Sequence, residues 1–187
     1  MDELQKALEM HRARRIPFGD RMRTAAVAVI LRPSPNGPEL LLIRRPARSG
    51  DRWSGNVAFP GGLAHASDRS PIETARREAH EEVGLELGEP IGALSELLTA
   101  QPGRARPLRV VPYVFVAEAG AEIVPDPREV AAAEWLDLAE LGAIVPRRIT
   151  KRIGPLLAPV RAMELPVGTL WGLTFSMVSE LARIFPR

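Results

Sequence analysis

The sequence predicts a single α/β domain, and three observations support this fold class. Runs at 24–31, 39–45 and 109–118 are largely apolar and are bounded by turn formers, which is typical of strands. Residues 70–83, and a stretch from about Leu170, carry apolar side chains at helical spacing. The 187 residues are 45% hydrophobic and 26% charged, a composition typical of one globular domain with its own core.

Composition excludes several classes of site. The chain has no cysteine and only three scattered histidines, so disulfides and thiolate zinc sites are excluded and a metal would be held by oxygen atoms. The N-terminus is mixed and acidic, and no apolar run approaches the ~18 residues of a membrane span. We therefore expect a cytoplasmic protein with no membrane partner.

Arginine supplies nearly all of the positive charge, since lysine occurs only at Lys6 and Lys151. The guanidinium group suits phosphate binding. A composition rich in arginine, alanine and proline is equally typical of a GC-rich genome, and the formal net charge is only +2. We therefore predict no nucleic-acid partner.

Taken in order, the chain begins with a helical extension over residues 1–20, because Leu4, Ala7 and Leu8 share one side of a helix. The strands at 24–31 and 39–45 should form a hairpin, because the connection between them contains proline, asparagine and glycine.

Further strands are expected at 91–100 and 109–118. Pro112 lies within the second run and predicts an edge position or a bulge, because proline cannot donate a ladder hydrogen bond. A short strand should follow near residues 134–138. The chain should end in a helix from about Leu170 with a continuous apolar stripe.

The helix at 70–83 has strong local boundaries. Ser70 and Glu73 form a capping box around Pro71, which occupies a position where no backbone N–H is needed. Gly84 stands where a left-handed stop residue is expected, so the helix should end near Val83.

Three carboxylates, those of Glu78, Glu81 and Glu82, fall on one side of this helix. Such like charges repel unless a cation joins them, and clustered oxygen ligands suit Mg²⁺ or Mn²⁺ next to substrate phosphates. Acidic helix faces are more often simply solvated. However, Gly61 and Gly62 precede the helix, and glycines allow close approach of the backbone, so that a carbonyl there can join the metal shell.

The residues from Phe59 to Leu85 resemble the Nudix box. Its second half, residues 77–85, matches Arg-Glu-apolar-x-Glu-Glu-x-Gly-apolar at every defined position. In the first half, Asp68 replaces the usual glutamate, and one extra residue precedes Arg77. Both departures resemble the coenzyme A pyrophosphatase branch of the family. That branch usually has a histidine near Trp53, which this chain lacks.

This resemblance implies the Nudix fold, a mixed β-sheet sandwiched between α-helices, over 1–187 with the box at 59–85. It also implies Mg²⁺ or Mn²⁺ as cofactor. The implied metal ligands are Glu78, Glu81, Glu82, Gly61 and Gly62, and the implied catalytic residues are Glu78, Glu81, Arg77 and Glu129. Arg77 would hold a box glutamate in place, whereas Glu78, Glu81 and Glu129 are all eligible as the general base.

The implied reaction is hydrolysis of coenzyme A or acyl-coenzyme A to 3′,5′-ADP and 4′-phosphopantetheine. Expected substrate contacts are Arg44, Arg45, Arg52 and Tyr113, although a core or edge role for Tyr113 is the alternative. The basic residues of 147–152 could contact the 3′-phosphate, or could be solvated surface.

Two alternatives to this assignment stay open. One is hydrolysis of ADP-ribose, another nucleoside diphosphate derivative or a nucleoside triphosphate, because the box contacts only the diphosphate and the metal. Another is a nucleotide-binding sensor without catalysis, against which the intact set of box acids argues. The expected partner is a small diphosphate molecule, and a homodimer is compatible with the sequence.

Overall fold

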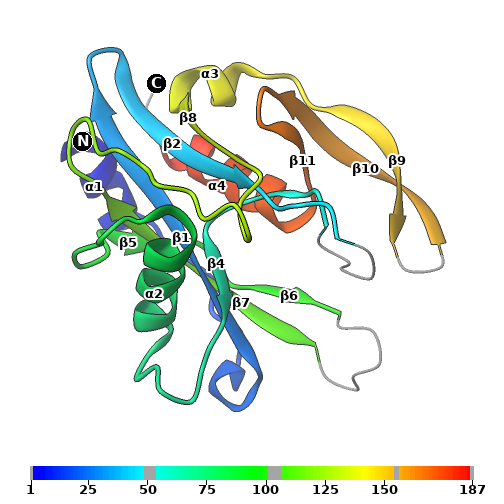
Figure 1. The fold of residues 1–187 in the computed structure, drawn as a ribbon, viewed down its shortest axis with the longest axis horizontal. Coiled ribbons are helices and arrows are strands. Elements are labelled where there is room, and N and C mark those ends of the chain that lie inside the picture. Colours follow the sequence, from blue (N-terminus) through cyan, green and yellow to red (C-terminus); the bar gives the residue numbers. More distant parts are fainter. Residues whose placement is uncertain (1, 49–53, 101–106, 154–155, 186–187) are drawn as a thin grey trace.

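The computed structural model describes residues 2–48, 54–100, 107–153 and 156–185 (Figure 1). Its helices are α1 (Asp2–Met10), the 3₁₀ helix η1 (Gly19–Arg21), α2 (Pro71–Val83), α3 (Leu138–Ala143) and α4 (Gly172–Ile184). Its strands are β1 (Thr24–Ser34), β2 (Gly37–Arg44), β3 (Val57–Ala58), β4 (Gly61–Leu63), β5 (Gly92–Ala93), β6 (Leu97–Thr99), β7 (Leu108–Val116), β8 (Ala132–Asp137), β9 (Arg147–Ile153), β10 (Leu156–Leu165) and β11 (Gly168–Trp171).

A mixed eight-stranded sheet forms the centre of the fold. Strand β1 pairs antiparallel with β2 and β4 and parallel with β7, and β2 pairs antiparallel with β8. The predicted hairpin between the first two strands is confirmed, with Ser34 opposite Gly37 at its turn. The short strand predicted near residue 134 is β8.

Helices cover both faces of this sheet, which confirms the predicted sandwich (Figure 1). Alternate residues of β1 point to opposite faces, as strand geometry requires. Ala26 and Ala28 pack with Ala75 and Ala79 of α2, so small side chains allow this helix to lie close to the sheet. Val29 belongs to the other core cluster, which includes residues of α1 and α4.

The strand predicted at 91–100 is divided into β5 and β6. Between them, the Ser95 N–H donates to a Glu180 carboxylate oxygen at 2.9 Å and the Glu96 N–H donates to the Arg14 carbonyl at 2.9 Å. These hydrogen bonds to distant segments take the place of the backbone hydrogen bonds that a continuous strand would form with β7. Pro112 lies in β7 opposite this interruption, where its carbonyl accepts from the Leu94 N–H. The edge position predicted for Pro112 is therefore wrong, because β7 has neighbours on both sides.

A second, three-stranded antiparallel sheet of β9, β10 and β11 was not predicted. All side chains of its first strand, β9, are exposed or half-buried. The sequence of β9 therefore lacks the alternation of apolar and polar residues from which a strand is predicted. The final helix begins at Gly172 rather than Leu170, because Leu170 and Trp171 belong to β11. In the ranges given above, no helix combines the length and apolar character required to cross a membrane.

A buried ion pair fixes the N-terminal extension, in which the helix covers only residues 2–10. The Arg109 guanidinium donates to both carboxylate oxygens of Glu96, at 3.0 and 2.5 Å, and the Ile16 N–H donates to the same carboxylate at 2.8 Å. Burial raises the pKa of Glu96, but these hydrogen bonds outweigh it and hold the pKa below its ordinary value. The ionised carboxylate therefore stabilises the fold.

We expect Glu96→Gln to lower the free energy of unfolding at pH 7 by about 1–3 kcal/mol. The lowered pKa gives stability above the ordinary carboxyl pKa of about 4.3, and this stability is lost as the pH falls through the folded-state value. Urea unfolding at a series of pH values should show wild type and variant converging in acid. The exposed Glu118→Gln is the control. If the free energies of unfolding of wild type and Glu96→Gln differed by the same amount at every pH, a contribution from the carboxylate charge would be contradicted.

Candidate active site

The box helix α2 begins and ends where its sequence predicts. The Ser70 hydroxyl accepts from the Glu73 N–H at 3.3 Å, and Gly84 adopts the left-handed conformation with φ 72°. After α2, the Val124 and Asp126 N–H groups donate to the Val83 and Glu82 carbonyls at 2.9 and 3.0 Å. The loop that carries Glu129 is thereby attached to the C-terminal end of the box helix.

Strand β4 brings two glycines against the acidic face of α2. Gly61 and Gly62 pair with Val27 and Ala26 of β1. A Cβ atom on Gly62 would lie 2.5 Å from Glu78 Oε1, so only glycine leaves room for this carboxylate. The Gly61 N–H donates to Glu82 Oε2 at 2.9 Å.

Glu82 is almost completely buried, with 1% of its side chain exposed. Arg45 Nη1 lies 3.7 Å from Glu82 Oε1, too far for a strong ion pair. Burial raises the pKa of Glu82 to about 8; the Gly61 N–H opposes this shift and the nearby Glu78 carboxylate adds to it. Burial likewise raises the pKa of Glu78. Two carboxylates thus lie close together, and burial outweighs the guanidinium groups beside them, Arg77 at Glu78 and Arg45 at Glu82.

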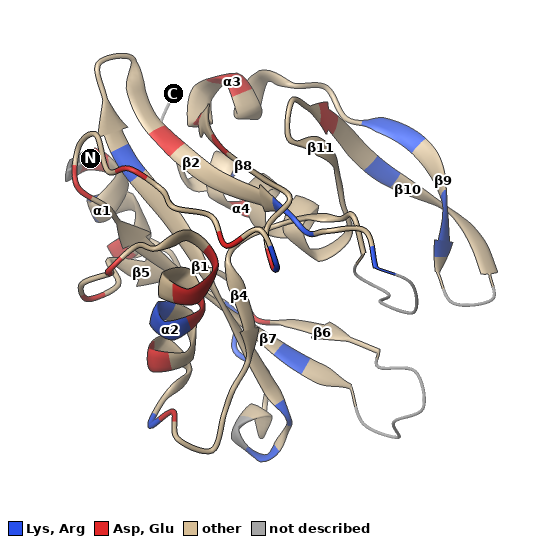
Figure 2. Ribbon diagram, in the orientation of Figure 1, with Lys and Arg blue, Asp and Glu red and all other residues tan. Residues whose placement is uncertain are grey.

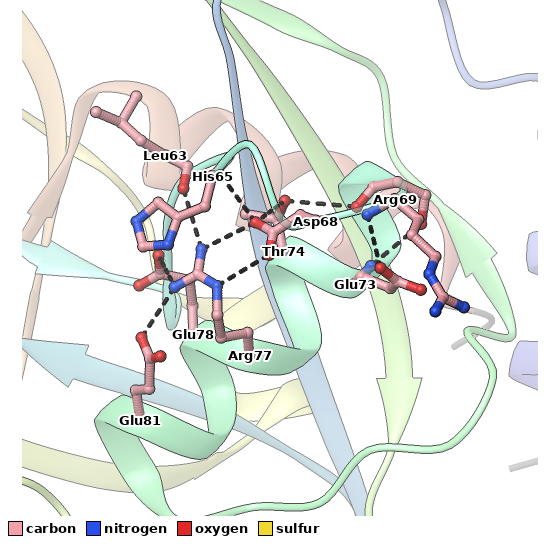
Figure 3. A network of polar contacts seen from close by, with 10 residues as sticks. Leu63, His65, Asp68, Arg69, Glu73, Thr74, Arg77, Glu78 and Glu81 are labelled. Atoms are coloured by element: carbon pink, nitrogen blue, oxygen red, sulfur yellow. Dashed lines mark hydrogen bonds and ion pairs between the residues drawn. The ribbon is translucent and has the colours of Figure 1, made fainter.

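Arg77 is the centre of a polar network on the side of α2 (Figure 3). Its guanidinium donates to Asp68 Oδ1 and Oδ2 at 3.2 and 3.1 Å, to Glu78 Oε1 at 2.8 Å, to Glu81 Oε2 at 2.9 Å and to the Leu63 carbonyl at 3.1 Å. The Arg77 guanidinium and the Thr74 hydroxyl hold the pKa of Asp68 well below its ordinary value. Asp68 therefore anchors Arg77, and Arg77 positions Glu78.

A cavity of about 730 Å³ extends from the α2 carboxylates to the second sheet. Glu78, Glu82, Glu129 and Arg45 line it near the box. Its wall also includes residues of β1, β3, β4, β6, β7, β9, β11 and α4, among them Val27, Leu108, Val110, Arg152, Trp171, Leu173 and Met177. One end is thus acidic, whereas much of the remaining wall is apolar.

A model of the NUDIX domain matches residues 22–158. The chain belongs to the Nudix family. An uncharacterized Nudix hydrolase, NudL of Pectobacterium atrosepticum, is 33% identical over 171 residues, which cover 87% of this chain and 81% of that protein. An uncharacterized protein of Schizosaccharomyces pombe is 39% identical over 109 residues; these cover 56% of this chain but only 33% of the yeast protein's length.

Among solved structures, the NUDIX domain of Shewanella oneidensis NrtR complexed with ADP ribose matches with a TM-score of 0.51. The sequence identity is 17%, and the match covers 71% of this chain and 79% of that one. This likeness concerns the fold. The family match and the NudL relative support assignment of the chain to the Nudix hydrolase class.

The structure brings together part of the predicted Nudix site. Glu78, Glu82, Gly61 and Gly62 line the cavity, and so does the exposed Glu129. Glu81 does not line it; its carboxylate is about half exposed and is paired with Arg77, four residues earlier on the helix. The roles predicted for these Nudix-box and loop residues and for Arg77 stay predictions.

The predicted substrate contacts are divided by the fold. Arg45 lines the cavity, whereas Arg44 is exposed and does not line it. Tyr113 also lies off the cavity wall and packs against the core cluster beneath α2, which fits the core role considered for it. Arg52 lies outside the described residues.

Two lining residues, Asn56 and Trp171, were not among the predicted contacts. Trp171 Nε1 donates to Asn56 Oδ1 at 3.2 Å. The two residues are 115 positions apart in the sequence, so no local pattern could indicate their contact.

The donor set fits a hard divalent cation of the kind that Nudix hydrolases generally use. Glu78 and Glu82 supply oxygen atoms at one cavity end, and the cost of burying these charges would be offset by a cation between them. In the part of the chain that the structure describes, no three acidic or histidine side chains stand close enough to hold a metal by themselves. Mg²⁺ commonly binds through one or two carboxylates, with water and substrate phosphates completing its shell.

We expect Arg77→Lys to reduce kcat by about 10- to 100-fold, because lysine keeps the charge but cannot bridge Asp68, Glu78 and Glu81 simultaneously. Arg76→Lys is the matched control, since Arg76 is the preceding residue on α2 but binds the Gly88 carbonyl and Glu89 away from the cavity. Steady-state hydrolysis at saturating Mg²⁺ tests both variants. Equal activity in the two would contradict the positioning role of Arg77.

Proposed function

We propose that this Nudix hydrolase cleaves the diphosphate of coenzyme A or acyl-coenzyme A to 3′,5′-ADP and 4′-phosphopantetheine. The observation that carries the hydrolytic part is the pair of buried carboxylates, Glu78 and Glu82, beside Gly61 and Gly62 at one end of the cavity. The cavity volume of about 730 Å³ is suitable for a small-molecule substrate.

In the proposed reaction, a water oxygen forms a bond to one phosphorus while the bridging P–O bond of the anhydride breaks. The bridging oxygen leaves with the other phosphate, and the proton released by water goes to solvent through a carboxylate. When bound, Mg²⁺ or Mn²⁺ supplies positive charge to the diphosphate oxygens and increases the acidity of the attacking water.

The protein groups would have separate roles. Glu78 and Glu82 would hold the metal, with Glu81 and a carbonyl of Gly61 or Gly62 as further donors. Arg45 would contact a phosphate oxygen, since it lines the same end of the cavity. Of the candidate bases, Glu78 and Glu129 line the cavity, whereas Glu81 would first have to leave Arg77.

Support for coenzyme A comes from sequence likeness. The Phe-Pro-Gly-Gly loop, the aspartate at Asp68 and the longer spacer before Arg77 all resemble the coenzyme A pyrophosphatase branch. Residues 56–59, just before the two glycines, also line the cavity. The absence of a histidine near Trp53 is the one departure from that pattern.

Incubation with Mg²⁺ and coenzyme A, acetyl-coenzyme A, ADP-ribose, NADH or a nucleoside triphosphate tests the proposal. Mass spectrometry should detect 3′,5′-ADP and 4′-phosphopantetheine, with coenzyme A esters giving the highest kcat/KM. Preference for ADP-ribose or a triphosphate would contradict the coenzyme A assignment. Nucleotide binding without any hydrolysis would favour a sensor instead.

A further inference from the structure

The cavity has a positively charged residue on the wall that belongs to the second sheet. Arg152 of β9 lines it, as do Ile153 and Trp171, whereas the carboxylates come from α2 and the loop after β7. Figure 2 shows acidic residues on α2 and basic residues on β9, on separate parts of the fold. A ligand in this cavity therefore meets charged groups at both ends.

Arg152 differs from the other basic residues of its strand. Arg147 is paired with Glu164 at 2.7 Å, and the Lys151 ammonium lies 5.4 Å from the centre of the Trp171 ring. Arg148 is exposed and does not line the cavity. For Arg152, no hydrogen bond or ion pair with another side chain is found within the described residues. Its guanidinium can thus bind an anion without first breaking a protein contact.

The wall near Arg152 suits the nucleoside part of a substrate. Trp171 lines the cavity, its indole N–H is paired with Asn56, and the Lys151 ammonium stands over its ring. Aromatic surfaces of this kind stack on nucleobases irrespective of base identity. A diphosphate bound at the carboxylates would then have its nucleoside directed toward Trp171 and any further phosphate on that nucleoside directed toward Arg152.

We propose that Arg152 binds a phosphomonoester on the nucleoside half of the substrate. It thereby selects nucleoside diphosphate esters that carry an additional phosphate, such as the 3′-phosphate of coenzyme A, over the same esters without it. This inference rests on the proposed function for the orientation of the substrate. Because Arg152 is exposed, solvent weakens its interaction with the phosphate. We therefore expect the additional phosphate to raise kcat/KM by about tenfold rather than more.

The test compares coenzyme A with dephospho-coenzyme A, which differ only in this phosphate. Wild type should have about tenfold higher kcat/KM for coenzyme A. Arg152→Gln should remove this preference by raising KM for coenzyme A, with kcat and the constants for dephospho-coenzyme A little changed. Arg148→Gln, on the same strand but off the cavity, should retain the preference. Equal losses for both substrates in Arg152→Gln, or no loss for either, would overturn the inference.

A binding experiment separates this inference from the proposed function. Calorimetric titration with 3′,5′-ADP and with 5′-AMP requires neither metal nor hydrolysis. Wild type should bind 3′,5′-ADP about tenfold more tightly, and Arg152→Gln should bind the two nucleotides alike. If wild type shows this difference but does not hydrolyse coenzyme A, the phosphate site stands and the proposed function fails. If wild type binds 3′,5′-ADP no more tightly than 5′-AMP, the phosphate site fails.

Discussion

Glu82→Gln should lower kcat by at least about 10²- to 10³-fold while leaving the fold intact. Glutamine has the same shape, and its amide oxygen can still accept the Gly61 N–H, which donates to Glu82 at 2.9 Å in the wild type. It cannot supply the negative charge that a divalent cation requires. The loss should therefore appear in metal binding and catalysis rather than in folding.

Stability measurements should separate these two effects. Burial raises the pKa of Glu82 to about 8, so keeping this side chain ionised at neutral pH costs folding free energy. The metal-free variant should accordingly be at least as stable as metal-free wild type. Mg²⁺ should raise the Tm of wild type, because a ligand that binds only the folded state stabilises it, and this shift should be absent in Glu82→Gln.

Glu86→Gln is the control for this experiment. Glu86 follows α2, is highly exposed and pairs with His80, so its substitution should change neither activity nor the Mg²⁺ shift. Near-normal turnover by Glu82→Gln, or an unchanged Mg²⁺ shift, would exclude Glu82 as a metal ligand. A large loss of Tm in the metal-free variant would instead indicate a structural role for the carboxylate.

The sequence predicts those parts of the site that depend on local signals. Ser70 and Gly84 set the ends of α2 through hydrogen bonds within a few residues, so the positions of Glu78 and Glu82 follow from helix geometry. Helical spacing also places Glu81 on the same side. However, spacing does not determine side-chain direction, and the Glu81 carboxylate, which is paired with Arg77, does not line the cavity.

Features that depend on distant contacts could not be predicted. The interruption of the strand at 91–100 follows from hydrogen bonds to Arg14 and Glu180, which lie far away in the chain. The sequence of β9, which forms part of the cavity wall, does not alternate between apolar and polar residues. Its side chains are all exposed or half-buried, so no buried face imposes such a pattern. The basic residues of 147–152 were candidate phosphate contacts from the sequence, but only the structure shows that Arg152 is the one that lines the cavity.

The adjacent glycines of β4 should respond to alanine in different ways. A Cβ atom on Gly61 would lie 2.5 Å from the Ala26 carbonyl oxygen and 2.7 Å from Val27 Cα, which are backbone atoms of the central strand and cannot move independently. A Cβ atom on Gly62 would instead meet the Glu78 carboxylate, which is the end of a flexible side chain. Overpacking should thus strain the sheet in the first case and displace the Glu78 carboxylate in the second.

Gly61→Ala should lower the free energy of unfolding by about 3 kcal/mol. Gly62→Ala should change it by less than about 1 kcal/mol but lower kcat/KM by about 10²-fold, because a displacement of about 1 Å in a catalytic group can cost that much. Urea unfolding and steady-state hydrolysis of both variants test this contrast. Gly88→Ala is the control, since its added methyl group meets no atom within 4 Å. Full activity of Gly62→Ala would show that the reaction does not require the Glu78 carboxylate to occupy the space beside Gly62. The assignment of Glu78 as a metal ligand would then fail.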